Sequence, residues 1–204
     1  METKRYQKKD IEQIADLLKE GKVVAFPTDT VYGLAVIYDD EKALEALKKS
    51  KGRPENKPIP TMVSSVSQLK EIACTNKTID TIAKYLMPGA LTIICKKQDR
   101  LPAYLTNGMD TIGIRMPNDD FILHLIDLCE KPLLVTSANL SGEKPGKTHE
   151  EVLEQLDGRI DAIVTGAAEG SMASTIVDVT SEDLKIIREG IISKKQILDV
   201  LEKN

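Results

Sequence analysis

KVVAFPTDTVYGLAVI, residues 22–37, holds two apolar runs separated by a short polar segment. The runs Lys22–Phe26 and Val31–Ile37 are rich in residues that favour β-strands, and Pro27 ends the first of them. Between them lies Thr28-Asp29-Thr30, whose side chains are of the kind that hydrogen-bond within turns. The stretch therefore predicts two buried strands joined by a polar turn.

Helical spacing of apolar residues alternates with further β-rich runs along the rest of the chain. Capping residues such as Asp10, Asp39 or Asp40, and Thr148 mark helix starts, and Gly21 ends the first helix. Helices are predicted over residues 10–20, 40–47, 67–73, 78–86, 119–128, 148–156 and from 193 onward, and strands at 60–64, 90–96, 111–116, 131–136, 161–165, 175–179 and 184–188. The alternation lacks strict βαβ regularity, so it predicts an α/β fold in a single domain, residues 1–204, with one mixed sheet.

The composition is that of an ordinary globular protein, with 41% hydrophobic and 29% charged residues among 204. A chain of this length buries about 70% of its unfolded surface, so its core needs no disulfide or metal. Tryptophan is absent and aromatic residues make up only 3%, which predicts an aliphatic core. The net charge of −4 argues against nucleic-acid binding over most of the surface, so any direct RNA contact would depend on a local basic patch.

Neither a metal site nor a disulfide framework is expected. The cysteines, Cys74, Cys95 and Cys129, are scattered, and together with His124 and His149 they form no cluster with the spacing of a metal site. The N-terminal METKRYQKKD has no apolar run, and no stretch approaches the roughly 20 apolar residues of a membrane span. These features predict a protein of the reducing cytoplasm without a membrane partner.

The segment Lys48–Lys57 is strongly basic and carries Lys51 and Arg53 two residues apart. In an extended loop both can face one anion, Lys as a point charge and Arg as a planar fork that matches phosphate or carboxylate. Pro54 and Pro58 stiffen the loop and lower the cost of ordering it on binding. Two other interpretations stay open, a solvated surface loop and a local RNA contact.

Two more polar loops follow apolar strands, the position at which ligands bind in open α/β sheets. One is the turn Thr28–Thr30 with Tyr32 beyond it, and the other is Thr136–Gly142, sequence TSANLSG. Hydroxyls and backbone N–H groups at such strand ends suit phosphate or carboxylate. Ordinary turns and helix caps use the same residue types, so a purely structural role stays open as well.

Two arginines lie in or beside apolar strands. Arg115 stands within Ile-Arg-Met at residues 114–116, and Arg188 follows two isoleucines. A buried arginine is rare unless it is paired, so each indicates either an anion site or a structural ion pair. For an ion pair, the candidate partners in the sequence are Glu169, Asp178 and Glu189.

The common nucleotide-binding and nucleophile motifs are absent. The sequence contains no G-x-x-x-x-G-K-[ST], no G-x-G-x-x-G and no G-x-S-x-G. Pro145-Gly146-Lys147-Thr148 imitates the end of a P-loop, but the first glycine at the required spacing is missing. If the protein binds a nucleotide, it therefore does so through other loops.

Taken together, the polar loops and their flanking strands resemble the YrdC-like family. One such motif is a weak signal, whereas seven in the family's order over residues 24–190 are specific. The matching stretches are Val24–Leu34, Lys51–Pro54 with Pro58, Met87–Thr92, Ile112–Pro117, Thr136–Gly142, Ser174–Asp178 and Arg188–Gly190.

The resemblance implies a twisted mixed sheet with flanking helices, curved around a deep, positively lined cavity. It implies a nucleotidyltransferase that converts L-threonine, bicarbonate and ATP into threonylcarbamoyl-adenylate and pyrophosphate. Mg²⁺ is expected to travel with the ATP phosphates rather than in a protein cage. Threonylcarbamoyl-transfer proteins then modify tRNA with the product.

The resemblance also implies roles for individual residues. The family's Lys-x-Arg and Ser-x-Asn tetrad falls on Lys51, Arg53, Ser137 and Asn139, which are expected to be catalytic and to contact the nucleotide. Threonine is expected near Thr30, Tyr32 and Arg115, with its carboxylate at Arg115. The remaining residues expected on the nucleotide side are Asn56, Thr111, Ser174 and Arg188.

The sequence departs from the family's pattern in two places. Many relatives carry a His after the basic loop, where this chain has Ile59–Val63, and many carry Ser-Pro-Thr where it has Pro145–Thr148. The length of 204 residues predicts the short, single-domain type of the family.

The main alternative function is a double-stranded RNA or tRNA-binding module without catalysis. A carbamoyl module of hydrogenase maturation is weaker, because its zinc-finger and acylphosphatase segments are missing.

Overall fold

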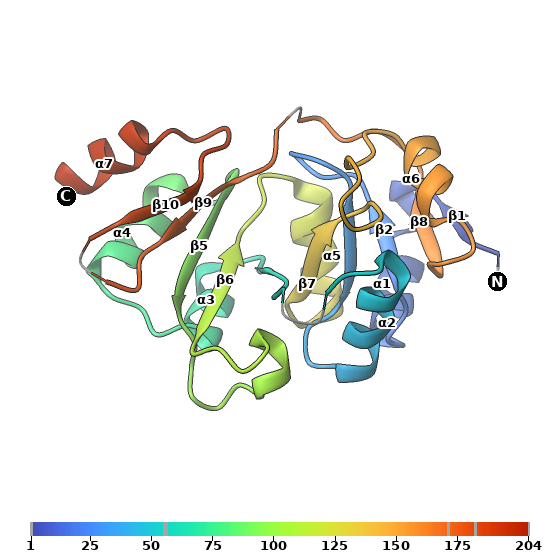
Figure 1. Ribbon diagram of the computed structural model, residues 1–204, viewed down its shortest axis with the longest axis horizontal. Helices are drawn as coiled ribbons and strands as arrows, with labels where there is room; N and C mark the ends of the chain where they lie inside the picture. Colours follow the sequence, from blue (N-terminus) through green and yellow to red (C-terminus); the bar gives the residue numbers. More distant parts are fainter. Residues whose placement is uncertain (1, 55–56, 171, 182, 204) are drawn as a thin grey trace.

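A computed structural model describes residues 2–54, 57–170, 172–181 and 183–203. Within these residues ten strands form one sheet in the order β1-β8-β2-β3-β7-β4-β6-β5-β9-β10 (Figure 1). The strands are β1 (Lys4–Tyr6), β2 (Val24–Phe26), β3 (Gly33–Ile37), β4 (Thr61–Met62), β5 (Leu91–Lys96), β6 (Thr111–Arg115), β7 (Leu133–Ser137), β8 (Ala162–Val164), β9 (Thr175–Asp178) and β10 (Lys185–Arg188). The N-terminus lies at the β1 end of the molecule and the C-terminus at the β10 end (Figure 1).

The sheet is mixed, as the sequence predicts. The stretch 22–37 forms the antiparallel pair β2–β3, in which Phe26 is opposite Gly33. Parallel pairs join β1 to β8, β2 to β8, β4 to β6 and β5 to β9, and the other neighbours are antiparallel. The prediction of an α/β fold with a mixed sheet and flanking helices is confirmed.

Helices cover both faces of the sheet. In β3, Leu34 and Val36 belong to one apolar cluster, and Ala35 and Ile37 belong to the other, because successive strand residues face opposite sides. The second cluster contains side chains of α1 and α5, and the first contains those of the other α-helices. The α-helices are α1 (Ile11–Lys19), α2 (Glu41–Lys51), α3 (Val66–Ile72), α4 (Lys77–Leu86), α5 (Asp120–Cys129), α6 (His149–Leu156) and α7 (Lys194–Glu202).

The expected caps at Asp40 and Thr148 are present, whereas the side chain of Asp10 makes no capping hydrogen bond at the start of α1. The side chains of Asp40, Asp119, Thr148 and Ser193 each accept a hydrogen bond from a backbone N–H in the first turn of their helix. At the other end of α2, Gly52 adopts the left-handed conformation with φ 60°, which ends the helix directly after Lys51. The cap therefore determines where the basic loop leaves the helix.

Several elements differ from the expectation. Strand β1 (Lys4–Tyr6) was not predicted, because it is a short polar edge strand recruited by parallel pairing with β8. Two 3₁₀ helices, η1 (Lys8–Asp10) and η2 (Ala103–Thr106), were also missed, and the strand expected at 60–64 shortens to β4.

Among the described residues, every helix is too short or too polar to span a bilayer.

Removing the side chain of Ile114 should destabilise the fold. Ile114 is fully buried in β6, in the larger apolar cluster. We expect Ile114→Ala to lower the free energy of unfolding by about 2–5 kcal/mol, because a cavity remains. Urea denaturation measures the change, with Val66→Ala as the control, since Val66 is 37% exposed and its truncation should cost about 0.5 kcal/mol or less. Equal losses in both variants would contradict the assignment of the core.

Candidate active site

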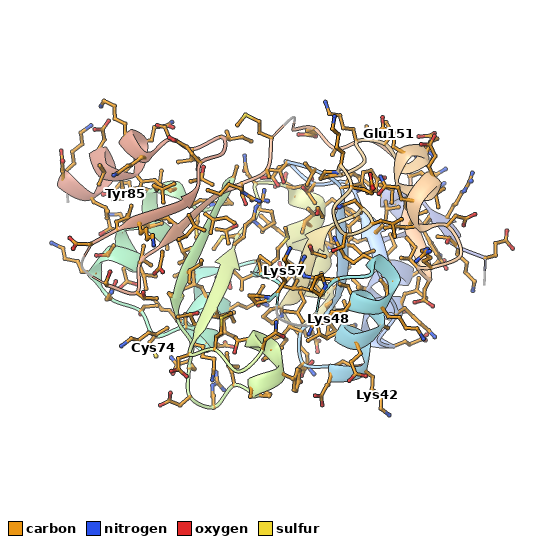
Figure 2. The ribbon with its side chains drawn as sticks, in the orientation of Figure 1. Lys42, Lys48, Lys57, Cys74, Tyr85 and Glu151 are labelled. Atoms are coloured by element: carbon orange, nitrogen blue, oxygen red, sulfur yellow. The ribbon has the colours of Figure 1, made fainter. Side chains whose placement is uncertain are left out.

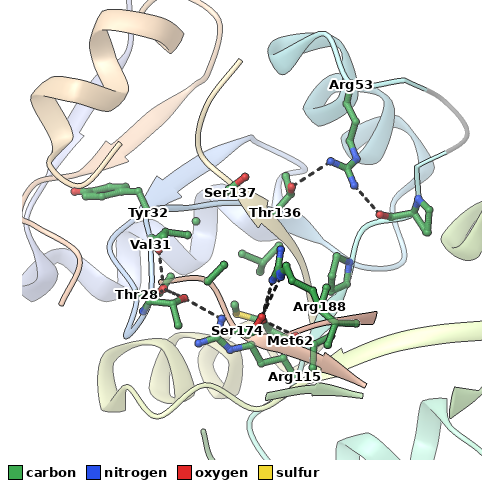
Figure 3. A pocket seen from close by; sticks show the side chains of 18 residues that line it. Thr28, Val31, Tyr32, Arg53, Met62, Arg115, Thr136, Ser137, Ser174 and Arg188 are labelled. Carbon is green, nitrogen blue, oxygen red and sulfur yellow. Dashed lines mark hydrogen bonds between the residues drawn. The ribbon is translucent and has the colours of Figure 1, made fainter. Parts of the chain in front are cut away.

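A cavity of about 290 Å³ opens at the ends of the central strands (Figure 3). Its walls come from the β2–β3 turn, the basic loop, the ends of β6 and β7, the segment before β9, and β10. Seven of the residues expected at the site from the sequence line it: Thr30, Tyr32, Arg53, Arg115, Ser137, Ser174 and Arg188.

The strand register brings these distant segments together. Gly33 at the start of β3 lies opposite Ser137 at the end of β7, which joins the polar turn to the Thr136–Gly142 loop. On the other side of the cavity, Thr92 of β5 is opposite Arg115 of β6 and pairs with Ile176 of β9. The sheet itself therefore positions the walls.

Arg115 is held by the polar turn. Its Nη2 donates to Asp29 Oδ1 at 2.6 Å and its Nη1 donates to Thr30 Oγ1 at 2.9 Å. The ion pair is buried, with side-chain exposures of 7% for Arg115 and 11% for Asp29. Burial lowers the pKa of Arg115, and the adjacent Asp29 carboxylate opposes that shift. The expected ion-pair partners were therefore wrong for Arg115, because the turn supplies the carboxylate.

Arg188 lies at the rim of the cavity and is anchored to Ser174. Its Nε and Nη2 donate to the Ser174 carbonyl at 3.2 and 2.8 Å, and the Ser174 hydroxyl lies 2.9 Å from Thr92 Oγ1. Partial desolvation and the nearby charge of Arg115 lower the pKa of Arg188. Arg115 and Arg188 therefore lie on the same side of the cavity, close enough for their positive charges to repel each other (Figure 3).

Lys51 and Arg53 form a second pair of cations. Lys51 is 2% exposed, and its Nζ donates to the Ser137 carbonyl and to Thr136 Oγ1. Burial and the charge of Arg53 lower the pKa of Lys51 to about 8. Arg53 donates to the carbonyls of Lys57 at 3.1 Å and Pro58 at 2.8 Å, so its guanidinium is fixed against its own loop.

Ser137 lines the cavity, whereas Asn139 braces the loop behind it. The Asn139 amide donates to the carbonyls of Leu140 at 2.7 Å and Glu143 at 2.9 Å. Its Oδ1 is buried without a hydrogen-bond partner in the described structure. Gln155 of α6 adds a second brace by accepting from the Leu140 N–H at 2.9 Å. The loop that carries Ser137 is therefore held in one shape.

Tyr32 borders the cavity but directs its hydroxyl elsewhere. The ring is fully buried, and the hydroxyl donates to the Val164 carbonyl of β8. Figure 3 shows the ring pointing away from the labelled arginines. Burial and nearby Glu150 raise the pKa of the hydroxyl, so it stays protonated. Through this hydrogen bond Tyr32 links the end of the polar turn to β8.

Three of the expected residues do not line the cavity in the described structure: Lys51, Asn139 and Thr111. Thr111 begins β6 opposite Lys96, four residues from Arg115, which is roughly 13 Å along a strand. Asn56 lies outside the described residues. Three polar residues of the cavity, Thr28, Thr92 and Thr136, were given no individual role from the sequence, although each lies within one of the matching stretches. Local sequence does not distinguish a threonine that lines a cavity from one that stabilises a turn or a strand, so only the tertiary structure assigns these three to the cavity.

The cations of the basic segment do not form one surface patch, because some are buried and others are exposed. Lys48 is 7% exposed and donates to Asn107 Oδ1 at 3.0 Å, and Lys51 is buried. Lys57 is exposed near the middle of the face seen in Figure 2. Helix α2 thus buries Lys48 and Lys51 and leaves the other cations of the segment nearer the surface.

Among the described residues, no three His, Cys, Asp or Glu side chains gather as they would around a metal ion.

Comparison with known proteins gives the same family as the sequence motifs. Residues 16–190 match the Sua5/YciO/YrdC family, described as "Telomere recombination". The chain is 35% identical over 189 residues to the threonylcarbamoyl-AMP synthase of Pyrococcus abyssi and 38% identical over 194 residues to that of Bacillus subtilis. The matches cover 92% and 94% of this chain but 56% of each relative, so the chain spans little more than half their length.

A solved structure supports the assignment. The structure of P. abyssi Sua5 complexed with L-threonine superposes with a TM-score of 0.90 at 34% identity, covering 98% of this chain and 60% of that one. The resemblance inferred from the seven motifs is thereby confirmed. The chain belongs to the Sua5/YciO/YrdC family.

Proposed function

We propose that this chain is a threonylcarbamoyl-AMP synthase, a nucleotidyltransferase that forms threonylcarbamoyl-adenylate and pyrophosphate from L-threonine, bicarbonate and ATP. The observation that carries the proposal is the charge of the cavity. Lys51, Arg53, Arg115 and Arg188 surround or adjoin it, and none of its described lining residues is Asp or Glu. The names of the two curated relatives and of the threonine complex support the same reaction.

The two pairs of cations suggest two halves of the site. Lys51 and Arg53, with Ser137 and Asn139 of the adjoining loop, suit the phosphates of ATP. Arg115, with Thr30 beside it, suits the threonine carboxylate, and Tyr32 supports that wall. The further nucleotide contacts are assigned to Asn56, Thr111, Ser174 and Arg188, and of these Ser174 and Arg188 have the support of lining the cavity.

The chemistry requires no protein nucleophile. The threonine nitrogen attacks the carbon of bicarbonate, and loss of water gives a carbamate. A carbamate oxygen then forms a bond to the α-phosphorus of ATP as the bond to pyrophosphate breaks. The cations hold the reactants in line and stabilise the charge on the transferring and leaving phosphates. Mg²⁺ would accompany the ATP phosphates and supply further positive charge there.

The product is a mixed anhydride, so a later enzyme must use it as an acyl donor. We place this chain, acting as one domain over residues 1–204, at the start of the threonylcarbamoyl modification of adenosine in tRNA, with separate transfer proteins downstream. The alternative, an RNA-binding module, has less support. The basic segment was the main feature in favour of RNA binding, but Lys48 and Lys51 of that segment are buried.

Pyrophosphate release tests the proposal. Purified protein with Mg²⁺ and ATP should release pyrophosphate only when threonine and bicarbonate are both present. A coupled colorimetric assay measures the release, and omission of each co-substrate is the control. Folded protein that releases none under any combination would refute the synthase. Salt-dependent binding to tRNA would then support the RNA-binding alternative, because phosphate contacts release counterions.

Arg115→Ala should raise the KM for threonine by about tenfold or more, because a hydrogen bond to a charged group contributes roughly 1.5–3 kcal/mol. The KM for ATP should change by less than about threefold. Initial-rate kinetics with each substrate varied gives both values. Arg100→Ala is a matched control, since Arg100 is an exposed arginine that donates to the Glu71 carbonyl. Equal changes in both KM values would make Arg115 a structural residue.

ATP binding should weaken as pH rises through 8. Lys51 has a pKa lowered to about 8, so it is charged below that pH and neutral above it. An anion binds the charged form, and the Kd for ATP should therefore rise about tenfold between pH 7 and pH 9. Calorimetric titration at several pH values measures this slope.

Lys51→Met should bind ATP more weakly and lose most of the pH dependence. Lys49→Met, which changes an exposed lysine on the same helix, should keep the slope of the unsubstituted protein. If Lys51→Met retained that slope, another group would be responsible for it.

A further inference from the structure

Asp29 is a largely buried carboxylate beside the cavity, behind Arg115, and the proposed reaction does not use it directly. One oxygen, Oδ1, accepts from Arg115 Nη2 at 2.6 Å. The other, Oδ2, accepts from the backbone N–H of Asn118 at 3.1 Å. Both oxygens are therefore engaged, one by the cation and one by the chain that follows β6.

The turn that carries Asp29 is clamped from two further directions. Thr28 Oγ1 accepts from the Thr30 N–H at 3.0 Å and donates to the Val31 carbonyl at 2.7 Å. On the outside, Gly170 packs so closely that a Cβ there would lie 2.6 Å from the Thr30 Cα and 2.7 Å from the Asp29 carbonyl oxygen. Only glycine fits at this position without a shift of the backbone. The Asp29 carboxylate is thus held in one place by the fold.

Arg115 has spare hydrogen-bonding capacity. A guanidinium has five N–H donors, and the contacts to Asp29 and Thr30 use one on each terminal nitrogen. The Nε of Arg115 is buried and has no partner in the described structure. An arginine with four rotatable bonds loses considerable entropy when it is fixed, and here the fixing is complete before any ligand arrives.

We propose that Asp29 is the positioning residue of the amino-acid site: it holds Arg115 in the orientation that receives the substrate carboxylate, and it acts through Arg115 alone. The inference rests on the proposed function. Asp29 also balances the charge of a buried arginine in the ligand-free protein, where an unpaired cation would be costly. Its contribution to catalysis is the preorganisation of Arg115 rather than contact with the reacting atoms.

The first test is the isosteric variant Asp29→Asn, which removes the charge and keeps the shape. We expect the KM for threonine to rise about tenfold or more, and the KM for ATP to change by less than about threefold. Asp39→Asn is the matched control, because Asp39 forms an exposed ion pair with Lys131, also at 2.6 Å. It should leave both KM values unchanged. Equal changes in both KM values for Asp29→Asn would overturn the inference.

The second test is a double-mutant cycle with Arg115→Ala. If Asp29 acts only through Arg115, then Asp29→Asn has no further effect on the threonine KM once Arg115 is removed. The double variant leaves no unpaired charge, so this comparison stands even where Asp29→Asn alone folds poorly. Effects that multiply across the cycle would overturn the inference.

The unsubstituted protein separates this inference from the proposed function. If it releases pyrophosphate with threonine, and Asp29→Asn has an unchanged threonine KM, only the role of Asp29 is wrong. If it shows no threonine-dependent release, the proposed function fails and the role of Asp29 fails with it.

Discussion

Mutual repulsion among four cations in or beside one cavity is the constraint on which the site depends. Lys51 and Arg115 are buried, Arg53 is half-buried and Arg188 lies at the rim. Loss of solvent around each lowers its pKa, and two of the four are lowered further by a neighbouring cation. Backbone carbonyls, threonine hydroxyls and the single carboxylate of Asp29 offset part of this cost. An anionic ligand would offset the rest, so ligand binding and stability are coupled in this protein.

The fold meets this constraint by assigning each cation to a different structural element. Lys51 is the last residue of α2, Arg53 follows its glycine cap, Arg115 ends β6 and Arg188 ends β10. The mixed sheet brings these ends to one cavity through its register rather than through a single loop. No single segment therefore carries the site, and a search for one compact binding motif in the sequence would not find it.

Much of this could be predicted from the sequence, and the remainder depended on tertiary pairing. The strand–turn–strand at 22–37 and the caps at Asp40 and Thr148 are local features, so their residues predict them. The partner of Arg115 was missed because Asp29 lies 86 positions away and resembles any turn aspartate. The direction of the Tyr32 hydroxyl was missed for the same reason, since its acceptor on β8 is 132 residues distant. Family resemblance identified seven of the lining residues without revealing which of them hold one another.

The two halves of the cavity differ in their electrical balance. Arg115 is neutralised by Asp29, whereas Lys51 and Arg53 are held by carbonyls and hydroxyls and have no carboxylate partner among the described residues. A triphosphate carries several negative charges and is attracted most strongly to the half with uncompensated cations. An amino acid carries a carboxylate together with an ammonium group, and the nearly neutral Asp29–Arg115 pair can hydrogen-bond the carboxylate without strongly repelling the ammonium. Arg188 lies on the Arg115 side, at the rim, and is held by the Ser174 carbonyl rather than by a carboxylate. Under the proposed function, the contrast between the Asp29–Arg115 pair and the Lys51–Arg53 pair favours one arrangement of the two substrates, with the phosphates at the basic loop and the amino acid at the polar turn.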